Sequence, residues 1–240
     1  MMEKRSEEYE VLEEVFDKPT LMTIYHFMDT GAVRKISGIV NSGKESRIYH
    51  GVGVNKRELA LKIYLVVSAE FKKGMLMYIQ GDPRFRRVKR DTKSLIYAWA
   101  LKEYKNLQKA YRSGVRVPKP IAVRNNVLVM EFIGKDGVSA PLLREVQLEH
   151  SKEVYQVLLE IVKRLYQKAH LVHGDVSEYN IMVWKGELVL FDISQAVPIE
   201  HPMANQFLRR DIRNLNNYFE KIGVQVNPLE DVYRWVTESD

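Results

Sequence analysis

A thirteen-residue segment, Leu171–Val183, constrains this chain more than any other part of its sequence. It begins with an apolar run, continues as a His-Gly-Asp motif ending at Asp175, and places Asn180 five residues after that aspartate. A second aspartate, Asp192, follows another apolar run, Leu188–Phe191. Catalysis of phosphoryl transfer needs one carboxylate near the attacking hydroxyl, and oxygen ligands for the divalent ions that bridge the nucleotide phosphates. The spacing therefore predicts Asp175 as the catalytic carboxylate and Asn180 and Asp192 as metal ligands.

Each of these residues also has a simpler structural interpretation. A His-x-Asp triplet is common by chance, and an aspartate at the end of a strand more often forms a turn than binds a metal. Here the triplet, the step to Asn180 and the apolar run before Asp192 occur together. Their joint occurrence favours the catalytic interpretation.

The residues around this motif resemble those of the RIO family of atypical protein kinases. The sequence HGDVSEYN at residues 173–180 is similar to the catalytic loop of that family. The segment Phe191–Val197 is similar to its metal-binding loop, and it is not the Asp-Phe-Gly of ordinary protein kinases. The resemblance runs from Val33 to Val232. It implies an α+β, bilobal protein-kinase-like fold, with an antiparallel sheet plus a helix in the N-terminal lobe and a reduced, mainly helical C-terminal lobe.

The resemblance and the apolar periodicity together predict three parts of the chain. Residues 1–32 are expected to form an N-terminal helical extension, with one helix over residues 6–16 and another from Asp17 to Gly31. Residues 33–132 are expected to form the kinase N-lobe, with a flexible insertion at 68–93, and residues 133–240 the C-lobe. In the C-lobe a long helix is expected from an N-cap at Ser151 to His170.

A polar loop between two predicted strands is a candidate phosphate-binding element. The loop contains Ser42, Gly43 and Lys44, and a strand follows through Tyr49. In kinases a glycine-containing hairpin at this place covers the nucleotide phosphates with its backbone N–H groups. A plain polar hairpin turn explains the same residues. The loop lacks the three glycines of the usual kinase pattern, but it is similar to the RIO version.

Lys62 interrupts the apolar run Leu59–Leu65, and a buried ammonium group needs a partner. In the predicted helix at residues 93–112, Glu103 falls on the apolar stripe that contains Ile96, Ala100 and Leu107. These two misplaced charges suggest an ion pair, which in kinases directs the lysine to the nucleotide phosphates. The alternative is a Lys62 whose alkyl chain lies over a strand edge and a Glu103 at the rim of the core.

The segment at residues 68–93 shows little periodicity and many basic residues, so we expect a flexible insertion. RIO kinases resemble this chain in carrying a flexible segment here that includes an autophosphorylated serine. Ser94 is the first candidate for that role among Ser68, Thr92 and Ser94. The basic residues are alternatively contacts for ribosomal RNA phosphates, or simply a solvated surface.

The connection between the predicted lobes follows the strand Val127–Phe132 and contains Gly134. By resemblance to kinases, the backbone of Glu131 and Ile133 is expected to bind the adenine of ATP. The residues after Asp192, Ile-Ser-Gln, are closer to the first RIO subfamily, whereas Gly-Lys-Glu-Ser in the phosphate loop leans toward the second. We expect an archaeal-type member of the first subfamily.

Composition narrows the partners and the compartment. The chain has no cysteine, which excludes disulfides and thiolate metal sites, and it shows neither a signal peptide nor an apolar run long enough for a membrane span. We therefore expect a soluble cytoplasmic protein with no membrane partner. A net charge of +6 favours a polyanionic partner such as RNA.

The predicted function is an atypical serine/threonine protein kinase, autophosphorylating, that uses ATP with Mg²⁺ or Mn²⁺. The resemblance also implies an ATPase mode, in which Asp192 is transiently phosphorylated, and a role in maturation of the small ribosomal subunit, with its precursor as the partner. Two alternatives remain open. One is a small-molecule phosphotransferase of the aminoglycoside or choline kinase type, and the other is a non-catalytic nucleotide-binding assembly factor.

Overall fold

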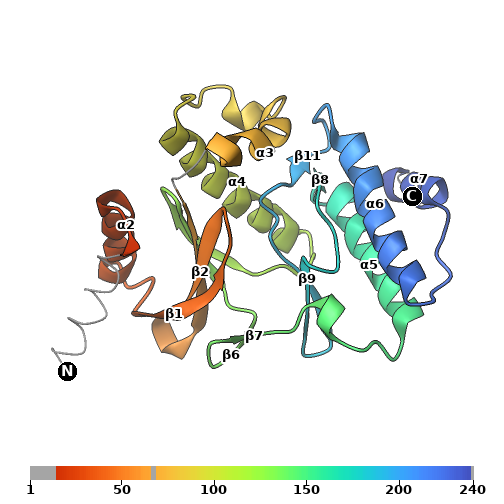
Figure 1. The fold of residues 1–240 in the computed structure, drawn as a ribbon, viewed down its shortest axis with the longest axis horizontal. Coiled ribbons are helices and arrows are strands. Elements are labelled where there is room, and N and C mark those ends of the chain that lie inside the picture. Colours follow the sequence, from red (N-terminus) through yellow and green to blue (C-terminus); the bar gives the residue numbers. More distant parts are fainter. Residues whose placement is uncertain (1–14, 66–68, 239–240) are drawn as a thin grey trace. The chain divides into compact units, whose positions relative to one another are not determined.

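The computed structural model describes residues 15–65 and 69–238, and its contacts divide the chain into two compact units (Figure 1). Within the described residues, the first unit comprises 15–65, 89–104 and 120–139, and the second comprises 69–88, 105–119 and 140–238. Most of the helix predicted at residues 6–16 lies outside the described residues. The boundaries predicted after residues 32 and 132 remain predictions about functional domains.

The first unit is built on a five-stranded antiparallel sheet. Its strand order is β1-β2-β3-β5-β4. The strands are β1 (Lys35–Ser42), β2 (Ser46–Val52), β3 (Glu58–Tyr64), β4 (Pro120–Arg124) and β5 (Val127–Glu131). A short helical turn, η1 (Val54–Lys56), connects β2 to β3, and a small hairpin of β6 (Gly134–Lys135) and β7 (Val138–Ser139) follows β5.

Helix α2 (Lys18–Asp29) covers one face of this sheet. It begins where expected, because the side chain of Asp17 accepts a hydrogen bond from the backbone N–H of Thr20 and a proline occupies the first turn. Its apolar residues join the inward-facing residues of the strands in one core cluster, which contains Phe16, Leu21, Ile24, Phe27, Val33, Ile36, Tyr49, Leu59, Leu61, Ile63, Val127 and Val129. Successive residues of a strand point to opposite faces, so Lys62 lies on the face of β3 away from this cluster.

Helix α4 (Thr92–Arg112) contributes residues to both units. Its first part, up to Tyr104, belongs to the first unit, and the rest belongs to the second. Its buried stripe contains the apolar residues predicted from the sequence, and also three polar ones, Lys102, Glu103 and Asn106. Buried polar groups need hydrogen-bond partners, so we expect each of these three side chains to make a specific polar contact.

The described part of the segment at residues 68–93, which the sequence predicted as a flexible insertion, contains helical structure, and its flexibility remains a prediction. Helix α3 (Ala69–Ile79) and the short helical turn η2 (Pro83–Phe85) form within it. Residues 69–88 also belong to the second unit rather than to the sheet-containing one. Long-range contacts place these residues in the second unit, because Tyr78 and Arg84 bind residues more than 100 positions away along the chain. The spacing of apolar residues along the sequence cannot predict such contacts.

The second unit packs three amphipathic helices side by side (Figure 1). They are α5 (Ser151–Gln167), α6 (Ala204–Lys221) and α7 (Leu229–Thr237), and α5 was predicted from its apolar spacing. The N-cap prediction was wrong, since His150 occupies that position of α5 and makes no side-chain capping bond. Short strands pair beside these helices, β8 (Leu171–Val172) with β11 (Val197–Pro198) and β9 (Ile181–Trp184) with β10 (Glu187–Leu190), after the helical turn η3 (Leu143–Glu145). Across the described part of the chain, no helix has the length and apolar character that crossing a bilayer requires.

Candidate active site

The loop between β8 and β9 carries Asp175, and residues before and after it in the loop fix its position. Gly174 turns the chain with a φ of +79°, a value that glycine adopts without strain. Five residues later, Nδ2 of Asn180 donates to the backbone oxygen of Asp175 at 2.7 Å and to its Oδ2 at 3.1 Å. The amide nitrogen of Asn180 is therefore committed to Asp175, and its amide oxygen is the atom that can ligate a metal.

A buried carboxylate from α6 fixes the backbone of the same loop. Asp211, 1 % exposed, accepts hydrogen bonds from the N–H of Gly174 at 2.8 Å and of Val176 at 2.9 Å, on either side of Asp175. Burial raises the pKa of Asp211 to about 7, and it outweighs the two N–H groups, which favour the charged form. Sequence reasoning missed this residue. The sequence contains one indication of it, because Asp211 lies four residues after Phe207 and four before Leu215, on the buried stripe of α6.

Helix α3 is joined to the loop that carries Asp175 through an arginine of α6. Nη2 of Arg210 donates to the hydroxyl of Tyr78 at 2.9 Å and also to the backbone oxygen of Gly174. Burial raises the pKa of the Tyr78 hydroxyl above its ordinary value, although the guanidinium of Arg210 opposes the shift. A region predicted as a flexible insertion is thus linked, through Arg210, to the residue next to Asp175.

The second predicted loop places Asp192 close to Asp175 within the same unit. The backbone N–H of Phe191 donates to the backbone oxygen of Asn180 at 3.0 Å, which joins the two loops. Asp192 has a φ of +53°, in the left-handed region that non-glycine residues rarely adopt. The hydroxyl of Ser194 donates to Oδ1 of Asp192 at 2.8 Å. Strained backbone of this kind persists only where neighbouring contacts fix it, and it is concentrated at functional sites.

The electrostatics of Asp175 reflect this neighbourhood. Desolvation is the main cause that raises the pKa of Asp175 above its ordinary value, and the negative charge of Asp192 adds to it. The hydrogen bond from Asn180 and the charge of Arg210 act in the opposite direction. A carboxyl group whose pKa is raised is a better proton acceptor, which suits a residue that receives the proton of an attacking hydroxyl.

The oxygen donors of these loops fit Mg²⁺ bound together with a nucleotide. Among the described residues, no group of three or more His, Cys, Asp or Glu side chains is placed to hold a metal. Mg²⁺ does not require such a group, because it usually binds one or two carboxylates and takes its remaining ligands from phosphates and water. Asp192 offers a carboxylate and Asn180 an amide oxygen, so the pair suits a metal that arrives with the phosphates of its substrate.

In the first unit, Lys62 and Glu103 form a buried ion pair. Nζ of Lys62 lies 3.0 Å from Oε1 of Glu103, and the two residues are 4 % and 1 % exposed. The hydroxyl of Tyr64, two residues further along the same face of β3, donates to the other carboxylate oxygen. Breaking a buried pair by removing one charge is strongly destabilising. The alternative, in which Lys62 lies over a strand edge and Glu103 lies at the rim of the core, is therefore wrong.

The remaining first-unit candidates lie at the ends of strands. Ser42 ends β1, and Gly43 and Lys44 form the exposed turn into β2, closed by a hydrogen bond of 2.9 Å from Gly43 N–H to the backbone oxygen of Ser46. Glu131 ends β5, and the buried Ile133 follows it before β6. That these residues and Lys62 converge with Asp175, Asn180 and Asp192 on one triphosphate remains a prediction.

Ser94 lies in the first turn of α4. Its backbone N–H donates to Oδ1 of Asp91 at 2.9 Å, so Asp91 acts as the cap of this helix. Hydrogen bonds from Ser94 lower the pKa of Asp91 below its ordinary value. Thr92, the other candidate described, begins the same helix, and Ser68 lies outside the described residues.

Comparison with known proteins identifies the family. A family model of the RIO domain matches residues 47–232 of this chain. The RIO-type serine/threonine-protein kinase Rio1 of Haloferax volcanii is 41% identical over 234 residues, which cover 98% of this chain and 80% of the relative. The protein of the same name from Methanocaldococcus jannaschii is 40% identical, covering 96% and 78%. The human serine/threonine-protein kinase RIO1 is 37% identical over 95% of this chain, which spans 40% of that longer protein.

Solved structures show the same fold. The crystal structure of the Rio2 kinase-ADP/Mg²⁺-phosphoaspartate complex from Chaetomium thermophilum aligns with a TM-score of 0.69 at 22% identity, covering 92% of this chain and 67% of that one. At this identity the likeness concerns the fold alone, and it confirms the predicted α+β protein-kinase-like fold. The matches in sequence extend over nearly the whole chain, and on that ground the chain belongs to the RIO family of atypical serine/threonine-protein kinases, as a member of the Rio1 type.

Proposed function

We propose that this RIO-type kinase binds ATP with Mg²⁺ and transfers the γ-phosphoryl group to a serine or threonine hydroxyl, with Asp175 as the residue that orients and deprotonates the hydroxyl. The observation that carries the proposal is the group of three side chains in the second unit. Asn180 is bonded to Asp175, and Asp192 is close enough to raise the pKa of Asp175. One proton acceptor beside two metal-binding oxygens is the arrangement that phosphoryl transfer requires.

The metal supplies charge neutralisation between the phosphate oxygens. Asn180 and Asp192 are proposed to hold it through their side-chain oxygens. Lys62, oriented by Glu103, is proposed to contact the phosphates, as are the backbone N–H groups of the turn at residues 42–44. The backbone of Glu131 and Ile133 is proposed to bind adenine.

An ATPase mode is proposed for the same residues. The Rio2 structure that resembles this fold is described as a complex with ADP, Mg²⁺ and phosphoaspartate. By analogy, Oδ of Asp192 attacks the γ-phosphorus, the bond from that phosphorus to the leaving oxygen of ADP breaks, and water then hydrolyses the acyl phosphate to aspartate and inorganic phosphate. The left-handed backbone of Asp192 supports a functional role for this residue, because the structure holds it in an unfavourable conformation.

The biological partner is proposed to be the precursor of the small ribosomal subunit. The net charge of +6 supports a polyanionic partner. Autophosphorylation is proposed at Ser94, whose position in the first helical turn suits a phosphate because the N-terminus of a helix favours negative charge.

The test is incubation of the purified chain with γ-labelled ATP and Mg²⁺, with and without small-subunit precursors. Label on protein and label in free phosphate are measured separately. Asp175→Ala is expected to lower transfer at least about tenfold, because general base catalysis typically contributes about 100-fold or more, while nucleotide affinity changes less than about twofold. Transfer that is unchanged in Asp175→Ala would reject the assignment of the base.

Three further variants assign the remaining roles. Asp192→Asn is expected to remove both the acid-stable and the acyl-phosphate label, since it removes a metal ligand and the nucleophile together. Ser94→Ala is expected to remove only the acid-stable label. Asp231→Asn, an exposed carboxylate of α7, serves as the matched control and is expected to leave both activities as they are. Loss of activity in the control would show that carboxylates outside the site matter equally.

A further inference from the structure

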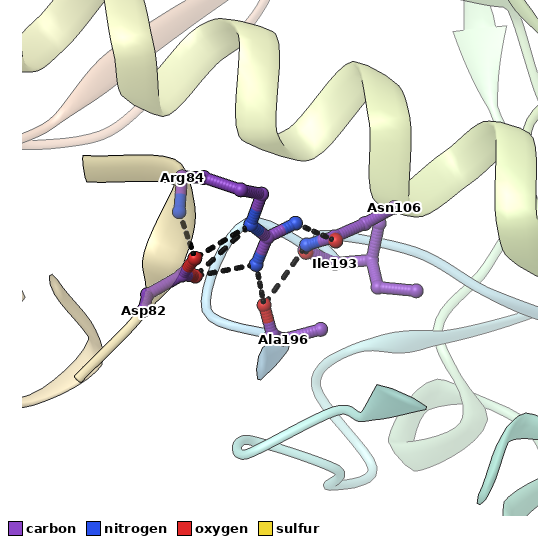
Figure 2. Close-up of polar contacts among 5 residues, drawn as sticks. All are labelled: Asp82, Arg84, Asn106, Ile193 and Ala196. Carbon is purple, nitrogen blue, oxygen red and sulfur yellow. Dashed lines mark hydrogen bonds and ion pairs between the residues drawn. The ribbon is translucent and has the colours of Figure 1, made fainter. Parts of the chain in front are cut away.

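Three residues from two separate segments form a buried polar cluster behind the metal-binding loop, in the second unit (Figure 2). Arg84 lies in the turn η2, Asp82 caps the start of that turn, and Asn106 comes from α4. Asp82 is 2 % exposed and Asn106 is fully buried. Their cluster touches the backbone of the loop that begins with Asp192.

The contacts of Arg84 define the geometry. Its guanidinium binds Asp82 in a fork, with Nε 2.9 Å from Oδ1 and Nη2 2.6 Å from Oδ2. Nη1 donates to Oδ1 of Asn106 at 2.7 Å, and Nη2 reaches the backbone oxygen of Ala196 at 3.4 Å. Fork-shaped arginine–carboxylate pairs are the geometrically specific ones, so Asp82 fixes the plane in which Arg84 meets Asn106.

The orientation of the Asn106 amide follows from chemistry. Arginine can only donate hydrogen bonds, so the atom of Asn106 that faces Arg84 must be its oxygen. The amino group then faces the metal-binding loop, where Nδ2 donates to the backbone oxygens of Ile193 and Ala196, both at 3.0 Å. The oxygen and the amino group of this amide therefore both have partners, and Figure 2 shows the carbonyl oxygen of Ala196 in contact with both Asn106 and Arg84.

The two carbonyl groups belong to the first and last residues of a tight turn directly after Asp192. The backbone N–H of Ala196 donates to the backbone oxygen of Ile193 at 3.3 Å, so Asn106 binds both ends of this turn. Asp192 itself is left-handed, with a φ of +53°. An unfavourable conformation needs neighbouring contacts to hold it, and the fixed carbonyl of Ile193 belongs to the very next residue.

We propose that Asn106, oriented by Arg84 and Asp82, is a positioning residue that sets the geometry of Asp192 for binding of the metal with its nucleotide. The inference rests on the proposed function, since it assumes that Asp192 ligates that metal. It assigns a role to part of the predicted flexible insertion, because Asp82 and Arg84 support the metal-binding loop. Arg84 is accordingly engaged inside the protein rather than available for RNA phosphates.

The test measures metal-dependent binding of a fluorescent ADP analogue, titrated with Mg²⁺ and compared with the affinity in EDTA. Asn106→Asp keeps the size of the side chain and the contact with Arg84, but it turns a carboxylate oxygen toward two carbonyl oxygens. In this variant, the Mg²⁺ concentration that gives half of the maximal increase in affinity for the ADP analogue is expected to rise at least about tenfold. This is the usual effect of losing a partner that orients a metal ligand. The affinity in EDTA is expected to stay within about twofold of wild type, since no direct contact with the nucleotide is lost.

Two controls separate positioning from general damage. Asn216→Asp changes another buried asparagine of the same unit, which accepts from Tyr155 Oη at 2.8 Å and donates to the backbone oxygen of Asn227 at 2.9 Å. It is expected to lower the thermal midpoint without changing the Mg²⁺ requirement. In an Asp192→Asn background, adding Asn106→Asp is expected to change nothing further, because the residue acts through Asp192.

Each outcome decides the proposal. A folded Asn106→Asp with the Mg²⁺ requirement of wild type overturns it, as does an equal shift in Asn216→Asp or an additive effect in the double variant. If Asn106→Asp fails to fold, Arg84→Lys decides, because it keeps the charge but loses the fork: a raised requirement supports the proposal and an unchanged one overturns it. If the affinity of the wild-type protein for the ADP analogue does not change with Mg²⁺, the proposed function is overturned together with this inference. If the inference alone fails, the wild-type protein binds the ADP analogue in a Mg²⁺-dependent way, and the variants show the same Mg²⁺ requirement as wild type.

Discussion

The buried carboxyl group of Asp211 makes the stability of this protein depend on pH in an unusual direction. In the folded state burial raises the pKa of Asp211 to about 7, whereas its ordinary value is 3.8. The folded protein therefore holds this proton more tightly than the unfolded chain does. The resulting stabilisation is fully present below pH 3.8 and is lost as the pH rises to about 7. Paired surface carboxylates behave in the opposite way.

The magnitude follows from the two pKa values. One pH unit corresponds to about 1.4 kcal/mol per proton. Between pH 5 and pH 7 the free energy of unfolding is expected to fall by about 2 kcal/mol through Asp211 alone, and to level off above pH 8. An Asp211→Asn variant lacks this proton, so the difference in unfolding free energy between wild type and variant is expected to shrink by that amount.

The assay is urea denaturation of both proteins without nucleotide or metal, followed by tryptophan fluorescence at half-unit steps from pH 5 to pH 8. Comparing the difference between the two proteins cancels the carboxylates that they share. Asp231→Asn serves as the control, because Asp231 is exposed and its curve is expected to run parallel to wild type. A wild-type minus Asp211→Asn difference that stays constant across this range would refute the reasoning, and would mean that Asp211 is ionised throughout.

Three further predictions use other parts of the structure. Gly134→Ala is expected to lower the free energy of unfolding by more than about 2 kcal/mol in urea titration, because its Cβ would lie 2.1 Å from a backbone oxygen of β7. Gly186→Ala, with nothing within 4 Å of its Cβ, is expected to lose only about 1 kcal/mol through its φ of +80°, and an equal loss in both would contradict the steric argument. Glu103→Gln is expected to weaken binding of a fluorescent ATP analogue about tenfold by releasing Lys62 from its buried pair, and unchanged affinity would disprove the role of that pair. Tyr155→Phe is expected to lower the thermal stability by about 1 to 2 kcal/mol, since its buried hydroxyl makes two hydrogen bonds, and an unaltered midpoint would show that water replaces them.

Periodicity predicted the elements that bury an apolar stripe. Helix α2 begins beside Asp17 as predicted, β3 covers the predicted apolar run, and α4 and α5 appear within a few residues of their predicted bounds. These predictions succeed because the spacing of apolar residues is a local property that must match the geometry of one helix or one strand. The contact between Lys62 and Glu103 follows the same logic, since each charge stands out against its own apolar stripe.

Contacts made by the aperiodic segment could not be predicted in this way. Residues 69–79 form α3 although their pattern gives little sign of it, and Arg84 binds a residue 112 positions away. The segment is basic, and composition alone suggests a solvated or RNA-binding surface. In the structure Arg84 instead meets Asp82 and Asn106, because a carboxylate and an amide oxygen are buried nearby and need a donor.

The sequence by itself determined the family of this protein and predicted its chemistry, because the spacing of Asp175, Asn180 and Asp192 is a local pattern typical of phosphoryl transfer. Only the tertiary structure decided which residues support them. Asp211, Arg210 and Asn106 contact these loops through hydrogen bonds to backbone groups far away in the chain. A hydrogen bond depends on distance and direction in space, and neither is written in the local order of residues.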